Sequence, residues 1–229
     1  RMKVIPLEGA TAAFQVGQDV NTDFFSYYKM VWFLVFTAIG TVMFLYRYFV
    51  NEDIYIKKTN IYYPMIVYTV FVILSTIFAT HRDVALLGFI DRYENMYVLI
   101  GYMLCLFLAI NLIDNEEQVK YLFFALGASS IIISIIGIFQ FGGMDLFASS
   151  FGKKIIIPSQ YINAIESIKF QFSGAKRIYG TLFNPNYVGV YMSVLFSLAC
   201  TVLLLSKDNF IRIFFGIVSL LSLINLLGS

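Results

Sequence analysis

Long runs of apolar residues, separated by short polar segments, dominate this chain. A helix that crosses a membrane needs about 20 apolar residues, and six stretches approach that length. These stretches lack the alternation of polar and apolar residues that membrane β-strands show. The pattern predicts an all-α fold, a polytopic transmembrane helical bundle with six membrane helices at Tyr28–Val50, Tyr63–Thr80, Met96–Ile113, Tyr121–Phe141, Tyr187–Ser206 and Phe210–Ser229.

The polar segments divide the chain into four parts. The first is a polar N-terminal segment, and the second holds four of the expected helices with short loops. The third is a long loop, and the fourth holds the last two expected helices. In residue numbers these parts are 1–27, 28–141, 142–186 and 187–229. Because the chain starts at Arg1 and its last apolar run stops at Ser229, we expect it to be the N-terminal part of a larger bundle.

The long loop carries apolar residues at the spacing of one helix face. Tyr161, Ile165, Ile168 and Phe172 follow this spacing, which predicts an amphipathic helix over Ser159–Phe172 on the membrane surface. Basic residues outnumber acidic ones in the loop. They either bind a ligand or meet anionic lipid headgroups.

The two sides of the predicted bundle differ in basic residues. Helix counting puts the loops 51–62, 114–120 and 207–209 on one side and the long loop on the other. A plain count of Lys and Arg would place the side of the long loop in the cytoplasm. We assign it to the outside instead, because most of the excess lies in one loop with an expected ligand-binding role. Loop 142–186 and segment 1–27 are then external.

The composition excludes several classes of protein. Hydrophobic residues make up 59% of the chain and charged residues 13%, with a mean hydropathy of +0.79, which excludes an ordinary soluble domain. The net charge of +2 is too small to indicate a nucleic-acid partner. Cys105 and Cys200 lie inside apolar runs and the chain has a single His, so we expect no disulfide framework, no metal and no cofactor.

The run from Arg177 to Gly189 joins the long loop to an apolar stretch of membrane length. Asn184 suits a helix N-cap, and Pro185 suits the first helical position. A helix N-terminus offers unpaired N–H groups and a positive dipole end, both of which attract anions. The planar guanidinium of Arg177 suits phosphate. The run therefore predicts an anion site at a helix N-terminus, although Asn-Pro also starts helices that bind nothing.

These residues also resemble a known family. An arginine, the Gly180-Thr181 pair and then Asn184-Pro185-Asn186 at the head of a membrane helix are similar to the O-antigen ligase and polymerase family. Its members are bacterial polytopic membrane enzymes that transfer glycan from a polyprenyl-pyrophosphate carrier. The resemblance implies that this chain is a multi-pass protein of the bacterial cytoplasmic membrane.

A second polar cluster lies between the second and third predicted helices. Family members often carry a basic residue, an acidic residue and a glycine where the chain enters this helix. Arg92 and Glu94 match, whereas Asn95 stands at the place of the glycine. Arg82 and Arg92 can grip a pyrophosphate with Arg177, or the cluster is a salt bridge that anchors a helix end. His81 does not match the histidine that the family uses, and we assign it no catalytic role.

The resemblance also implies the substrates and the chemistry. The partners are an undecaprenyl-pyrophosphate-linked oligosaccharide donor, a glycan or lipid acceptor and membrane lipids. The acceptor hydroxyl attacks the anomeric carbon and the carrier pyrophosphate leaves without a metal. We assign no catalytic residue within the chain, expect any general base beyond Ser229 and expect this fragment alone to be inactive. The candidate ligands of the pyrophosphate are Arg177, Arg82, Arg92, Asn184 and Asn186.

Two other classes of function remain open. A transporter or lipid-linked glycan flippase also uses many helices, but it tends to place charges deep in its helices and to contain repeats. In a membrane protein without a ligand, all of these motifs would serve packing. Small residues at helical spacing predict close helix contacts on two helices, at Gly127, Ser130, Ser134 and Gly137 and at Gly189, Ser193 and Ser197. Asn111 and Asn225 lie in apolar runs and need partners inside the bundle.

Overall fold

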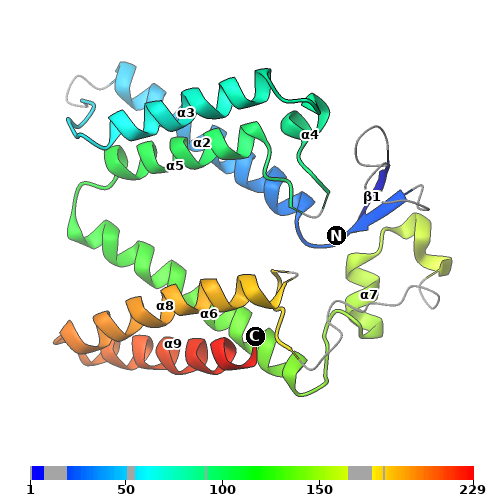
Figure 1. Cartoon of the computed structure of the whole chain (residues 1–229). Coiled ribbons are helices and arrows are strands. Elements are labelled where there is room, and N and C mark those ends of the chain that lie inside the picture. The colour runs from blue at the N-terminus through cyan, green and yellow to red at the C-terminus, as the bar shows by residue number, and fades with distance from the viewer. Residues whose placement is uncertain (1, 8–19, 51–54, 91, 165–176, 183) are drawn as a thin grey trace. The chain divides into compact units, whose positions relative to one another are not determined.

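The computed structural model describes residues 2–7, 20–50, 55–90, 92–164, 177–182 and 184–229 (Figure 1). These residues are mostly helical, which confirms the all-α prediction in its main part. The chain forms two compact units, Met2–Asn115 and Glu116–Ser229, which we call the N-terminal and C-terminal units.

All six predicted helices form, with small changes at their ends. The last of these helices starts at Asn209, one residue before its predicted start. The fourth was predicted to start at Tyr121 but starts at Glu116, because Glu116 and Glu117 form its first turn. Carboxylates in a first turn are favoured by the helix dipole. The helices are α2 Tyr27–Val50, α3 Tyr62–Ile77, α5 Met96–Leu112, α6 Glu116–Phe141, α8 Pro185–Leu205 and α9 Asn209–Gly228.

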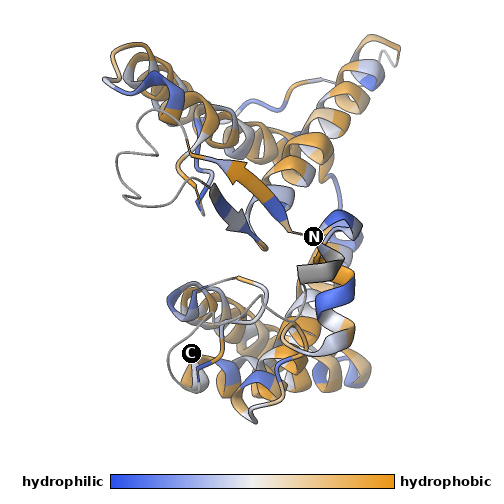
Figure 2. Cartoon of the chain, turned by 90° about the vertical axis from the view of Figure 1, so that its right-hand side faces the viewer, coloured by the Kyte–Doolittle hydropathy of each residue, from blue (hydrophilic) through white to orange (hydrophobic). Residues whose placement is uncertain are grey.

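Four of these helices, α2, α6, α8 and α9, are long and apolar enough to cross a membrane. The other two, α3 and α5, are apolar but have 16 and 17 residues. At a rise of about 1.5 Å per residue they are somewhat shorter than the roughly 30 Å hydrocarbon layer. Figure 2 shows hydrophobic residues along most of the length of the helices. Large apolar side chains such as Phe71 and Phe78 are exposed at 66% and 81%. This exposure is typical of helices that face lipid.

The N-terminal unit is built around α5, which contacts both α2 and α3. Gly101 allows the close approach of α2, since a Cβ there would lie 2.8 Å from Cε1 of Phe33. Phe107 packs edge-on against Phe44 of α2, with ring centroids 5.2 Å apart. A short helix, α4 (Arg82–Leu87), connects α3 to the segment that leads into α5.

A β-hairpin precedes α2, and the sequence pattern did not predict it. Strand β1 (Lys3–Pro6) pairs antiparallel with β2 (Val20–Asp23), with Lys3 opposite Asp23. Asp23 is buried, and its Oδ1 accepts hydrogen bonds from the backbone N–H groups of Ser26 and Tyr27 at 2.9 and 2.8 Å. These bonds fix the hairpin to the start of α2.

The C-terminal unit consists of α6, α8 and α9, with α9 contacting both other helices. Small residues on α6 allow this packing: Ser130 and Ser134 are fully buried, and a Cβ at Gly127 would lie 2.6 Å from Phe214. The packing prediction is thus confirmed for α6. On α8, Ser193 and Ser197 instead donate to carbonyl groups of their own helix, and Ser197 is exposed.

The long loop differs from its prediction where the structure describes it. It forms a short helix, α7 (Ser150–Ile156), capped by the Ser149 side chain, which accepts from the N–H of Gly152 at 3.0 Å. The start of the predicted amphipathic helix is a 3-10 helix, η1 (Ser159–Ala164), and not an α-helix. The remainder of that prediction, 165–172, lies outside the described residues.

Candidate functional site

The segment Arg177–Leu182, which we call the docked segment, packs against the ends of α6 and α9. The side chain of Gln140, near the end of α6, pairs with the backbone of Gly180. Its Oε1 accepts from the Gly180 N–H at 2.8 Å, and its Nε2 donates to the Gly180 carbonyl at 3.1 Å. Gly180 has φ +54° and a Cβ there would lie 3.1 Å from Ile133. Glycine is favoured at this position by both its backbone conformation and its surroundings.

Two more contacts hold the docked segment. The Ile178 N–H donates to the carbonyl of Gly228 at 2.9 Å, and the Ile178 side chain packs in a core cluster with Val188 and Met192. The buried Tyr179 hydroxyl donates to the Asp145 carboxylate. Burial, this hydrogen bond and the Asp145 charge all raise the pKa of Tyr179 above its usual value. Tyr179 is therefore a neutral donor at physiological pH, and the segment has a fixed backbone.

The head of α8 has the predicted cap. The Asn184 side chain accepts from the N–H of Asn186 at 2.9 Å, and Pro185 occupies the first turn. The Asn184 carbonyl accepts from the N–H groups of Tyr187 and Val188 at 3.0 and 3.3 Å. The expectation of unpaired N–H groups here is wrong, because Asn184 takes up the N–H donors of the first turn and proline has none. What remains for an anion is the helix dipole and nearby side chains.

The structure places three predicted ligands at this end of the C-terminal unit. Arg177 is exposed, and it forms no ion pair among the described residues. Asn186 is also exposed, so its side chain faces solvent at the first turn of α8. The Asn184 amide oxygen is occupied by the cap. Arg177 and Asn186 are thus the two side chains here that are open to a ligand.

The other two predicted ligands, Arg82 and Arg92, belong to the N-terminal unit. Both are exposed, Arg82 at the first turn of α4 and Arg92 in the segment before α5. No ion pair joins Arg92 to Glu94 in the described part of the chain, and Asp91 lies outside it. The alternative that Arg92 anchors a helix end through a salt bridge therefore finds no support from Glu94.

Asn95, which stands at the place of the glycine in the family pattern that the chain resembles, has a structural role. It is buried, and its Oδ1 caps α5 by accepting from the N–H of Val98 at 3.0 Å. Its Nδ2 donates to the carbonyl of Leu87 at the end of α4, at 3.2 Å. A glycine has no side chain with which to make these bonds, so Asn95 joins α4 to α5 in a way that glycine cannot.

Sequence reasoning missed a cavity of about 720 Å³ in the N-terminal unit, which we call the hairpin cavity. It is bounded by β1, the first turns of α2, α4 and the start of α5. Beside it, Gly88 has φ +89° and Tyr93 has φ +52°, a conformation that is rare for a residue with a side chain. Neither Arg82 nor Arg92 lines the cavity. Its lining includes Lys3, Tyr27, Asp83, Tyr93, Asn95 and Tyr97.

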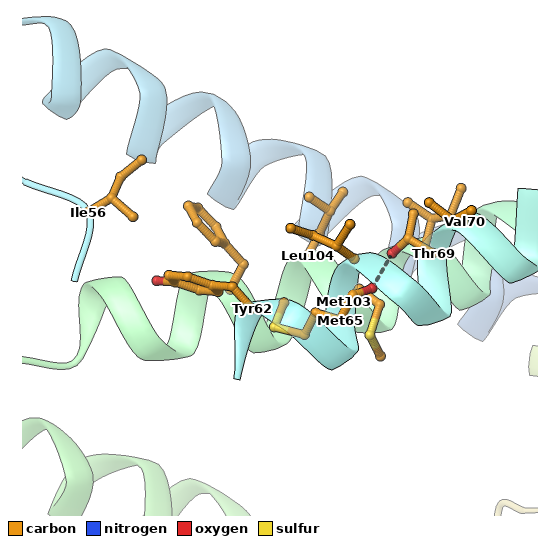
Figure 3. A pocket seen from close by; sticks show the side chains of 10 residues that line it. Ile56, Tyr62, Met65, Thr69, Val70, Met103 and Leu104 are labelled. Carbon is orange, nitrogen blue, oxygen red and sulfur yellow. Dashed lines mark hydrogen bonds between the residues drawn. The ribbon is translucent and has the colours of Figure 1, made fainter. Parts of the chain in front are cut away.

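An apolar groove of about 410 Å³ follows α3 and α5 in the same unit (Figure 3). Figure 3 shows Met65, Met103 and Leu104 among its lining side chains. The Thr69 hydroxyl donates to the carbonyl of Met65 at 2.8 Å, and Tyr62 accepts from Asn111 at 2.8 Å. Because these polar groups are already paired, the groove presents hydrocarbon and suits an acyl or prenyl chain.

The two asparagines in apolar runs have the expected partners. Asn111 accepts from the N–H of Lys57 at 2.9 Å, and Lys57 Nζ is 2.8 Å from the Asp114 carboxylate. Asn225 is fully buried and donates to the carbonyls of Ser134 and Leu221 at 3.3 and 2.9 Å. Asn225 is closed to a ligand by its burial, whereas Asn111 also lines a small cavity of about 180 Å³ with Arg47 and Asp114.

Comparisons with protein families, curated proteins and solved structures find no match for the chain. The similarity to O-antigen ligases and polymerases therefore depends on the motif residues alone.

Proposed function

We propose that the chain is the N-terminal part of a membrane glycan transferase of the O-antigen ligase and polymerase type. It acts in the bacterial cytoplasmic membrane and moves saccharide from an undecaprenyl-pyrophosphate carrier to a glycan or lipid acceptor. All six helices cross the membrane in this proposal, with α3 and α5 among them, and loop 142–186 is external.

The observation that carries the proposal is the setting of Arg177. Its backbone neighbour Ile178 is almost fully buried and hydrogen-bonded to α9, while the guanidinium itself is exposed. No carboxylate of the described residues neutralises it. An exposed guanidinium beside a hydrogen-bonded backbone, with no ion pair among the described residues, is available to bind an anion.

The resemblance to O-antigen ligases and polymerases implies the chemistry of the transfer. The acceptor oxygen attacks the anomeric carbon as the bond from that carbon to the pyrophosphate oxygen breaks. Negative charge grows on the leaving pyrophosphate, and Arg177 stabilises it, with the Asn186 amide as a second donor. Asn184 acts by capping α8. Arg82 and Arg92 are secondary candidates, and the acceptor proton passes to a general base that we do not assign to any residue of this chain.

The apolar groove supports the choice of a lipid-linked donor. Its lining suits the prenyl chain of the carrier. The alternative, a transporter or flippase, would place ionisable residues inside its helices. Among the described residues, the buried polar side chains of the C-terminal unit are neutral: Ser130, Ser134, Gln140, Ser219, Ser222 and Asn225. We therefore favour transfer over transport.

The test is to replace Arg177 in the full-length protein. We expect Arg177→Ala to lower glycan transfer by about 10²–10³, since it removes a charge that stabilises the leaving group. Arg177→Lys should recover only part of the loss, because an ammonium lacks the paired N–H geometry. The measurement is transfer of lipid-linked oligosaccharide to acceptor, normalised to protein in the membrane.

Arg212→Ala is the matched control. Arg212 is also exposed, but it lies in the first turn of α9, whereas the docked segment contacts the last turn. Its replacement should leave transfer unchanged. Near-normal transfer by Arg177→Ala, or an equal loss in both variants, would remove Arg177 from the mechanism.

A further inference from the structure

The hairpin cavity has the chemistry of a binding site, and the roles proposed for Arg177 and Asn186 do not use it. Among the described residues that line it, Lys3 and Asp83 are the charged ones, with one charge of each sign. A pyrophosphate would therefore meet a carboxylate as well as a cation. The lining favours a ligand without net charge that can both donate and accept hydrogen bonds.

The remaining lining is aromatic and aliphatic. Tyr27, Tyr93 and Tyr97 line the cavity, together with apolar side chains such as Met30 and Ile90. Lys3 Nζ lies over the Tyr27 ring, 5.2 Å from its centre, so one face of this ring already contacts a cation. A cavity with aromatic faces and a few polar groups fits a small molecule with one apolar face and a polar rim.

A sugar ring has this character, because its C–H groups form an apolar face and its hydroxyls surround the edge. We propose that the hairpin cavity binds a neutral sugar residue of a glycan substrate. The proposal relies on the proposed glycan transfer for the origin of that sugar. In this assignment Asp83 accepts from sugar hydroxyls, Lys3 donates to them and Tyr97 contacts the apolar face.

Hydrogen bonds join the elements that form the walls of the cavity. Asp23 ties the hairpin to α2, and Asn95 ties the end of α4 to the start of α5. A Cβ at Gly88 would lie 2.7 Å from the Cα of Tyr93, so these backbones touch. The unusual φ of Tyr93 places a strained residue in the wall of the cavity, and such strain is often retained at binding sites.

The test measures sugar binding without glycan transfer. Saturation-transfer NMR is applied to the full-length protein in lipid nanodiscs, with methyl glycosides of glucose, galactose, N-acetylglucosamine and rhamnose as probes. We expect a saturation-transfer signal, which reports binding, for at least one of these glycosides. Asp83→Ala and Tyr97→Ala should each weaken its binding by about tenfold or more, the effect of losing one charged hydrogen bond or one aromatic contact.

Matched controls exist for both variants. Glu94→Ala removes an exposed carboxylate, and Tyr63→Ala removes a tyrosine that is 73% exposed; neither residue lines the cavity. Both should bind the glycoside normally. Arg177→Ala should also bind it normally while losing transfer, so that failure of the transfer mechanism and failure of this site are distinguishable.

Four outcomes would overturn the proposal. The first is the absence of a saturation-transfer signal for every glycoside. The second is an equal weakening of glycoside binding in the variants and in their controls. The third is displacement of the bound glycoside by inorganic pyrophosphate, which would show an anion site. Binding of glycerophosphoethanolamine in place of the glycosides would likewise identify a site for a zwitterionic lipid headgroup and contradict a sugar site.

Discussion

The docked segment and the hairpin cavity show two ways in which loops can cover the ends of apolar helices. In the C-terminal unit, the docked segment fills the space at the end of α6 and α9 with paired polar groups and a buried isoleucine. In the N-terminal unit, the hairpin and α4 border an open cavity of about 720 Å³ at the helix ends. A filled end can present a charge on its surface, whereas a hollow end can enclose a ligand.

Both arrangements use polar side chains near helix ends to hold a loop backbone. Gln140 binds Gly180 in one unit, while Asn95 binds Leu87 and Asp23 binds the start of α2 in the other. An unpaired backbone group is costly beside apolar helices, so each such bond determines the path of a loop. The difference between the two ends is therefore in what the loops surround and not in how they are attached.

The largest effect that we predict concerns the side of the membrane on which each end lies. The proposed topology puts the docked segment and the hairpin cavity on the same, external side. In a background without Cys105 and Cys200, cysteines at Phe151 and Tyr97 should react fully with an impermeant thiol reagent in intact cells. These side chains are exposed at 74% and 51%.

Cysteines at Lys207 and Tyr55 are the controls for the opposite side. Both side chains are exposed. Tyr55 lies in loop 51–62 and Lys207 in loop 207–209, and both loops are predicted to face the cytoplasm. They should react only after the membrane is opened. If Phe151→Cys and Tyr97→Cys were labelled from different sides of the membrane, the docked segment and the hairpin cavity could not serve one reaction. If Lys207→Cys and Tyr55→Cys reacted in intact cells and the other two did not, the proposed orientation would be wrong.

The second prediction tests whether the filled end depends on tight packing. A Cβ at Gly137 would lie 2.1 Å from Oδ1 of Asn225 and 2.5 Å from Cγ2 of Ile178. Asn225 cannot move freely because its amide is bonded to two carbonyls. We expect Gly137→Ala to lower the free energy of unfolding by about 2–3 kcal/mol, as overpacked cores do, and to speed hydrogen exchange in the docked segment.

Gly216→Ala separates this packing effect from the general effect of alanine in a helix. A Cβ at Gly216 would lie 3.7 Å from Leu203, an ordinary contact. Alanine there should be neutral or should stabilise by up to about 1 kcal/mol. Equal stability of the two variants in denaturant unfolding would contradict the tight packing of the filled end.

Hydropathy and local helix signals predicted most of the fold but little of the candidate site. The apolar runs located all six helices, and Asn184-Pro185 located the start of α8, because both signals lie within the element that they describe. The hairpin escaped prediction since its strands have four residues each and β2 is mostly polar. Asn184 was predicted as the N-cap of α8, and this cap takes up N–H donors that the predicted anion site would need.

The contacts that shape the two ends join residues distant in sequence. Gln140 and Gly180 are 40 positions apart, and the hairpin cavity draws its lining from Lys3 to Tyr97. No local pattern encodes such a juxtaposition. Arg177 could be singled out from its sequence, but the rigid segment beside it and the absence of an ion pair in the described residues follow only from the tertiary contacts.

The smallest predicted effect concerns Tyr179, whose hydroxyl joins the docked segment to Asp145. Tyr179→Phe should lower the free energy of unfolding at pH 7 by about 2 kcal/mol, because it removes a buried hydrogen bond to a charged group. Tyr187→Phe is the control, since its ring is 46% exposed and forms no hydrogen bond among the described residues. It should change stability little.

The effect of Tyr179 should also depend on pH in a defined direction. Its pKa is raised in the folded protein, so the folded state holds this proton more tightly than the unfolded state. The stabilisation is fully present below the unfolded pKa of about 10 and is lost as the pH rises above it. Thermal unfolding between pH 8 and 11, about the ordinary tyrosine range, should therefore show a constant gap between wild type and Tyr179→Phe up to about pH 10 and a shrinking gap above it. A gap that stays constant or widens above that pH would mean that the Tyr179 hydroxyl is not held by Asp145, and that the filled end is secured by Gln140 and Ile178 alone.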